Sequence, residues 1–140
     1  MGRINYTGVV KGGLLAGVIV NVGEGLLNGV ILAAANAAVA ERLGAPQTTA
    51  VLAMYLLMGM VMGVTLVWIY AAIRPRFGPG KQAAIIAGLL VWFLVYGTYM
   101  TMNGALHIYP NDAMALSIVW GMVEMPLAAL AGAWLYTEEG

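Results

Sequence analysis

Two glutamates, Glu24 and Glu124, lie in the middle of apolar stretches long enough to cross a membrane. A charged side chain at the centre of a membrane helix costs ~2.5–3.5 kcal/mol on insertion scales, so ionisable residues there are rare and commonly functional. A carboxyl group in that setting can carry a proton, bind a cation or act as a buried hydrogen-bonding group. The elements that carry the two acids determine which of these roles they can take.

The composition indicates an integral membrane protein. Hydrophobic residues make up 62% of the chain and charged residues only 9%, whereas soluble domains carry about 25% charged residues. We expect one all-α membrane domain over residues 1–140, since backbone polar groups in lipid must be satisfied within the helices. The formal net charge is zero, which argues against a nucleic-acid partner.

Four apolar stretches reach the ~20 residues that a membrane-spanning helix needs. They predict an integral membrane four-helix bundle with spans at about 8–32, 49–73, 82–103 and 113–136. Arg74-Pro75 should close the second span, and Asn111 or Asp112 should cap the fourth. Residues 33–44 predict a helical extension or interfacial helix with Gly44 at its C-cap, followed by Pro46.

Basic residues indicate the orientation, because short loops rich in Lys and Arg remain in the cytoplasm. All of them except Arg42 lie near the start of the first span or between the second and third spans: Arg3, Lys11, Arg74, Arg76 and Lys81. Both termini are therefore expected to be cytoplasmic. An aromatic belt is expected on that side, formed by Trp68, Tyr70, Trp134 and Tyr136.

Small residues recur at every fourth position and predict close helix packing, which is how helices associate where lipid offers no hydrophobic drive. The expected packing positions are Gly13, Gly17, Gly25 and Gly29 in the first span, Gly59 and Gly63 in the second, and Ser117, Gly121 and Pro126 in the fourth. Pro126 lacks an amide hydrogen, so it should also bend its helix beside Glu124.

The two glutamates should lie at the same depth. At 1.5 Å per residue, Glu24 is ~20 Å beyond Lys11 and Glu124 is ~18 Å from Tyr136, near the same membrane surface. Asn21, Glu24 and Asn28 are spaced i, i+3, i+7 and share one side of the first helix. The sequence therefore predicts a polar site in which Glu24 and Glu124 meet, with Asn21 and Asn28 within reach.

Two carboxyls that meet in a low dielectric cannot both ionise cheaply, so the pair tends to share a proton. One interpretation is a site that carries protons or binds a cation, coupled to the bend at Pro126. The other is that both acids are neutral and hydrogen-bonded, and hold helices together at ~0.6–2 kcal/mol per bond. The asparagines nearby favour the second interpretation slightly.

Other chemistry has little support in the sequence. The chain has no Cys, one serine and one histidine, so neither a serine triad nor a His-rich metal site is expected, and we expect neither an enzyme nor a bound metal or cofactor. His107 is a weak candidate to ligate a haem or chlorophyll metal. Met54, Met58 and Met62 form a stripe in the second span that most simply packs or contacts lipid.

Four segments resemble those of small, uncharacterised bacterial four-span membrane proteins. They are NVGEGLLNG at 21–29, IYAAIRPRFGPG at 69–80, WGMVEMP at 120–126 and GAWLY at 132–136. The resemblance covers most of the chain and implies the architecture and a bacterial inner-membrane location, with no mechanism attached. Small multidrug resistance transporters are similar in plan, with four short spans and a glutamate in the first. This chain lacks their surrounding pattern and adds Glu124.

Two functions therefore remain in view. The favoured one is an accessory, assembly or scaffold subunit that works by close helix packing, as a homo-oligomer or within a larger membrane complex in the lipid bilayer. The alternative is a small proton- or cation-coupled transporter or channel that uses Glu24 and Glu124. Four spans rarely enclose a gated path alone, so such a transporter should need a dimer.

Overall fold

The structure is a computed structural model that describes residues 3–45 and 47–137. The described part of the chain is helical, without strands, which confirms the all-α prediction. Its elements are α1 (Tyr6–Leu26), the π-helical turn η1 (Leu27–Ile31), α2 (Ala33–Leu43), α3 (Thr49–Phe77), α4 (Lys81–Trp92), the π-helical turn η2 (Phe93–Gly97), α5 (Thr98–Ala105) and α6 (Asn111–Leu135).

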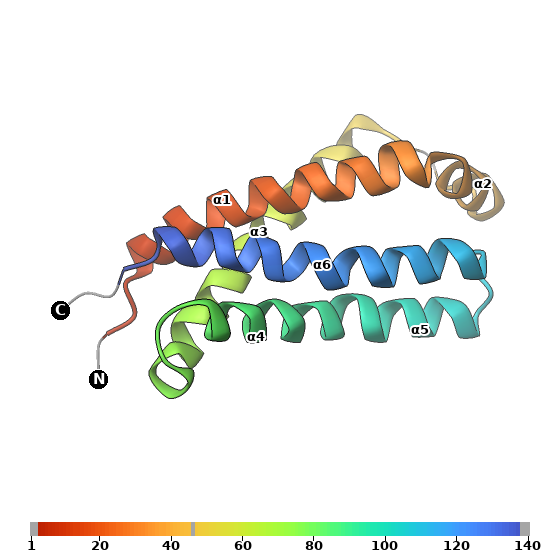
Figure 1. Ribbon diagram of the computed structural model, residues 1–140. Coiled ribbons are helices and arrows are strands. Elements are labelled where there is room, and N and C mark those ends of the chain that lie inside the picture. Colours follow the sequence, from red (N-terminus) through yellow and green to blue (C-terminus); the bar gives the residue numbers. More distant parts are fainter. Residues whose placement is uncertain (1–2, 46, 138–140) are drawn as a thin grey trace.

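Within the described residues, four helical stretches are long and apolar enough to span a membrane, as expected for a multi-pass protein. They are Tyr6–Ile31, Thr49–Phe77, Lys81–Ala105 and Asn111–Leu135. Figure 1 shows α6 between α1 on one side and the continuous α4–η2–α5 rod on the other, while α3 crosses behind them. The two chain ends lie at the same end of the molecule (Figure 1). They are joined where the Asn5 amide donates to the Tyr136 hydroxyl at 3.2 Å.

Helix α3 joins the other helices mainly through its second half. Residues 49–58 are exposed on almost every side, with Val51 alone half-buried. The core residues of α3 begin at Gly59 and continue through Leu66, Val67 and Tyr70. The first part of α3, residues 49–58, is therefore left uncovered by the other helices of the chain.

Glycines bring the helix backbones into direct contact. In lipid, where no hydrophobic effect drives helices together, such van der Waals packing stabilises their association. A Cβ added at Gly63 would lie 2.1 Å from the Gly17 nitrogen, and one at Gly12 would lie 2.3 Å from the Gly132 carbonyl oxygen. An added Cβ at Gly13 would lie 2.6 Å from Val64 Cα, and one at Gly59 would lie 2.1 Å from the end of the Asn21 side chain. Small residues at these positions are thus required by the α1–α3 and α1–α6 contacts.

Gly25 and Gly29, predicted to pack in the same way, meet no other helix of the described chain. Both are exposed, and an added Cβ would meet nothing within 4 Å at either position. The reason is the diagonal path of α3 (Figure 1), which is joined to this part of α1 by the hydrogen bond from Asn21 Nδ2 to the Leu56 carbonyl at 3.0 Å. Beyond it the two helices separate.

The helix ends agree with the sequence in one case and differ in two. Gly44 closes α2 in the left-handed conformation, with φ 62°, as predicted, while Pro46 lies outside the described residues. Pro75 does not close α3, which continues to Phe77, because a proline so near the end sacrifices only one hydrogen bond. The fourth helix has Pro110 rather than Asn111 or Asp112 at its N-cap position, while Asp112 Oδ1 accepts a hydrogen bond from the Ala113 amide at 2.9 Å within the first turn.

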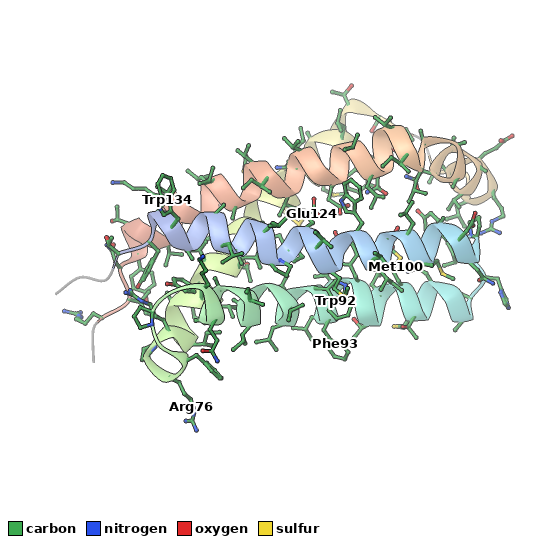
Figure 2. The ribbon with its side chains drawn as sticks, in the orientation of Figure 1. Arg76, Trp92, Phe93, Met100, Glu124 and Trp134 are labelled. Carbon is green, nitrogen blue, oxygen red and sulfur yellow. The ribbon has the colours of Figure 1, made fainter. Side chains whose placement is uncertain are left out.

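Of the four residues expected in the aromatic belt, two are exposed and two are buried. Trp134 is 80% exposed and points away from the helices (Figure 2), and Trp68 is also exposed. Tyr70 and Tyr136 are instead buried and pack edge to face, with ring centroids 5.8 Å apart. The Arg74 guanidinium lies 5.6 Å from the Tyr136 ring, so these tyrosines tie α3 to the end of α6 rather than facing lipid headgroups.

Candidate functional site

The structure places Glu24 of α1 and Glu124 of α6 together. Glu124 is only 7% exposed and lies in the space between α6 and α1 (Figure 2), whereas Glu24 is half-buried. The two carboxyl groups interact with each other. Gly23 of α1 faces the Glu124 side chain and leaves room for it. A Cβ added at Gly23 would lie 1.7 Å from Glu124 Oε1. Two acids thus share one closely packed space inside the membrane-spanning part.

Tyr96, in the turn η2, bridges the two acids. Its hydroxyl donates a short hydrogen bond to Glu24 Oε1 and lies 3.5 Å from Glu124 Oε2. A phenol has one proton to donate, so a second hydrogen bond at this oxygen requires a proton on Glu124 that is donated to Tyr96. The arrangement therefore suits a carboxyl pair that holds one proton between its members.

Gly121 makes the bridge geometrically feasible. Tyr96 belongs to the rod on one side of α6, and Glu24 belongs to α1 on the other side. The Tyr96 ring passes against Gly121, where an added Cβ would lie 2.6 Å from the ring. Gly121 thus packs against η2, as predicted for a packing position. Its lack of a side chain allows Tyr96 to reach across α6 to Glu24.

Asparagines extend the polar site toward α2. Asn28 Nδ2 donates to Glu24 Oε2 at 2.7 Å, and Asn36 Nδ2 of α2 donates to Asn28 Oδ1 at 3.2 Å and to the Asn28 carbonyl at 3.0 Å. Asn21, predicted to belong to the same site, lies elsewhere. Its amide bonds the Leu56 carbonyl of α3, because a residue three positions before Glu24 is rotated about 60° around the helix.

Each of the three helices at this site has an interruption in its regular ladder of α-helical hydrogen bonds there. The π-helical turn η1 begins three residues after Glu24 and contains Asn28, η2 contains Tyr96, and Pro126 lies two residues beyond Glu124 inside α6. Single π turns inside α-helices occur frequently at functional sites. Pro126 also contacts α4 closely, since a Cβ at Gly88 would lie 2.5 Å from Pro126 Cα.

The site has hydrogen-bonding capacity that its described neighbours leave unused. Glu124 Oε1 and Trp120 Nε1 are buried without a hydrogen-bond partner. The Trp120 indole interacts with the Glu124 carboxyl, although the two do not meet hydrogen-bond geometry. The nearest basic residue along α1 or α6 is Lys11, about three and a half turns from Glu24. A proton or a cation is thus what the pair needs for neutrality.

The remaining candidates lie outside this site. Ser117 is buried and donates to the Ala113 carbonyl of its own helix at 2.9 Å. His107 is exposed in the loop between α5 and α6 at φ 51°, and the described residues contain no cluster of three potential metal-ligating side chains. Met54 and Met58 are exposed, as expected for residues that contact lipid.

Tyr96, Trp120 and Asn36 were not assigned to the site from the sequence. For Tyr96 a signal was present, because it lies ~22 Å beyond Lys81 along its helix, close to the ~20 Å estimated for Glu24. Depth alone therefore placed a phenol level with the two acids. The direction in which Tyr96 points depends on the π turn, which apolar periodicity does not reveal.

Replacing Gly23 with alanine should displace the Glu124 carboxyl without separating the helices. The added methyl would occupy the position of Glu124 Oε1, so the end of that flexible side chain must move and weaken its approach to Tyr96. Gly25→Ala is the matched control, because nothing lies within 4 Å of its added Cβ. We expect a changed infrared carboxyl absorption in Gly23→Ala only; identical spectra would contradict the described position of Glu124.

A search of protein family models, curated proteins and solved structures finds no match to this chain.

Proposed function

We propose that the protein is a small proton-coupled membrane transporter or channel in which Glu24 and Glu124 form the proton-binding site. The observation that carries this proposal is the Tyr96 hydroxyl placed between two carboxyls in a buried, closely packed space.

The packing of the site favours a proton over a larger cation. Gly23 and Gly121 leave no room even for a methyl group beside Glu124 and Tyr96. A proton needs no cavity, whereas Na⁺ or an organic cation needs several ligands or a pocket around it. The site therefore suits a transferred or coupling proton, and any other substrate would bind elsewhere or in another conformation.

The proposed setting is the inner membrane of a bacterium, with both termini in the cytoplasm. The bacterial location is what the sequence resemblance implies. The orientation is supported by the distribution of basic residues, most of which lie at the end of the molecule where α1 begins and α6 ends. Four spans are few for a complete gated path, so the working unit would be a homo-oligomer. The proposal includes no catalysed reaction.

An accessory or scaffold subunit is the second candidate function. It is favoured by the exposed first half of α3 and by the exposed pair Gly25 and Gly29, since lipid-facing glycines four apart permit close approach of another helix. In that case the acids would only stabilise the fold, and the partner would be another membrane subunit.

Proton flux into liposomes separates the two functions. The purified chain is reconstituted, a pH gradient is imposed, and a trapped pH-sensitive dye reports flux for the native protein, Glu24→Gln and Glu124→Gln. We expect both variants to fall to the rate of protein-free liposomes, because neither amide can release a proton. Glu41→Gln, an exposed acid of α2, is the control and should keep the native rate.

Stability of the same variants completes the test. Native flux equal to that of empty liposomes, together with loss of thermal stability in Glu24→Gln and Glu124→Gln, would contradict transport and support the accessory subunit. Loss of flux in variants as stable as the native protein would contradict a purely structural role.

A further inference from the structure

We infer that α2 is a lid on the Asn28 side of Glu24, with Arg42 as its latch; this inference rests on the proposed proton-binding function. Helix α2 follows η1 and lies at the end of the molecule opposite the chain termini (Figure 1). It carries one buried side chain, Val39. Segments with few buried apolar contacts open at low free-energy cost, so α2 is suited to move.

Two polar attachments hold α2 in place. At its far end, Arg42 Nη2 donates to the carbonyl of His107 at 3.3 Å and makes a shorter hydrogen bond to the carbonyl of Ile108. These carbonyls belong to the loop between α5 and α6, and the positive φ of His107, 51°, helps to present them. Nearer its start, Asn36 bonds Asn28. A guanidinium bonded to carbonyls is a strong but reversible tie.

The same attachments connect the lid to the acid. Asn36 donates to Asn28 Oδ1, and Asn28 in turn donates to Glu24 Oε2. Movement of α2 away from η1 would thus remove the partner that orients Asn28, and so alter the surroundings of Glu24. Glu24 is half-buried and Glu124 almost fully buried, which makes Glu24 the carboxyl that exchanges its proton with the outside.

The geometry around α2 allows it to swing. Leu32, between η1 and α2, has the non-helical angles φ −101° and ψ 13°, and Gly44 ends α2 in the left-handed conformation. A cavity of about 360 Å³ lies between α2 and the loop, and its lining includes Ala38, Arg42 and Tyr109. The helix therefore has a break at each end and free space on one side.

Carbodiimide labelling tests the lid directly. Dicyclohexylcarbodiimide reacts with protonated carboxyls within membranes, and mass spectrometry of the reconstituted protein measures its rate of addition to Glu24. We expect Arg42→Ala to raise that rate about tenfold, which corresponds to ~1.4 kcal/mol of latch free energy. Arg76→Ala removes an exposed arginine at the opposite end (Figure 2) and should leave the rate unchanged.

A second variant closes the lid instead of opening it. The chain has no cysteine, so Ala38→Cys combined with Tyr109→Cys places two unique thiols in the lining of the cavity. A bifunctional thiol reagent that spans them should slow labelling of Glu24, while the same protein without the reagent labels at the native rate.

The outcomes distinguish the lid from the proposed function. Equal labelling rates in the native protein and Arg42→Ala, or unchanged labelling after cross-linking, would overturn the lid even if proton flux is present. Absence of proton flux with labelling that still responds to Arg42→Ala would instead overturn the proposed function and leave α2 as a lid.

Discussion

Tyr96→Phe is expected to lower the free energy of unfolding by about 1–3 kcal/mol, the cost of leaving a buried polar partner unsatisfied. The substitution keeps the ring that packs on Gly121 and removes only the hydroxyl between Glu24 and Glu124. Two carboxyls then face each other without a bridging donor, so a second proton must be bound or the acids must separate. Proton flux should fall as well. Reversible unfolding in mixed micelles measures the stability, and the liposome assay measures the proton flux.

Tyr99→Phe provides the control for this experiment. Tyr99 lies one turn further along the same rod and is exposed, so loss of its hydroxyl should change neither quantity appreciably. If Tyr96→Phe matched Tyr99→Phe in both stability and flux, the Tyr96 hydroxyl would have no role in joining the acids, and the description of the site as a bridged pair would have to be given up.

Gly63→Ala is expected to cause the largest structural loss, at the crossing of α1 and α3. The added Cβ would lie 2.1 Å from the Gly17 nitrogen and 2.4 Å from the Gly13 carbonyl oxygen. Backbone atoms, unlike the end of a side chain, cannot yield locally, so the helices must move apart. Overpacking costs about 1–3 kcal/mol and occasionally more. Thermal unfolding in detergent, followed by circular dichroism, measures the effect.

The same change at Gly29 separates crowding from any general effect of alanine in a membrane helix. Gly29 is exposed, with nothing within 4 Å of an added Cβ, so Gly29→Ala should shift stability by no more than about 0.5 kcal/mol. A comparable loss at both positions would instead point to a partner packed on Gly29. That result would favour the accessory-subunit function.

The sequence predicted the helical class, the four spans and the meeting of Glu24 with Glu124, because length, hydropathy and depth follow directly from residue order. It placed Asn21 in the wrong contact. Small differences in helical phase decide which neighbour a side chain faces, and spacing of i, i+3 leaves about 60° between Asn21 and Glu24. Its partner is a carbonyl of α3, whose diagonal path no pattern in the sequence encodes.

The glycines illustrate the same limit. Gly13, Gly17, Gly25 and Gly29 are equivalent in sequence, yet the first two are buried against α3 and the last two are exposed. Glycines at every fourth position show where another helix could approach closely. The crossing geometry of the helices determines where that approach occurs. The bridging role of Tyr96 was missed for a related reason, since the π turn sets its direction.

The alignment of η1, η2 and Pro126 with the two acids has a mechanical consequence. Regular helices resist bending through their ladder of hydrogen bonds, and prolines and π turns are where that ladder is weakest. Here the weak points of three neighbouring helices fall at one level. A bilayer thinner or thicker than the spans forces them to tilt or kink, and such deformation would concentrate at this level. Lipids of different chain length would then change the geometry of the site where Glu24 and Glu124 meet, and with it the proton affinity of that carboxyl pair.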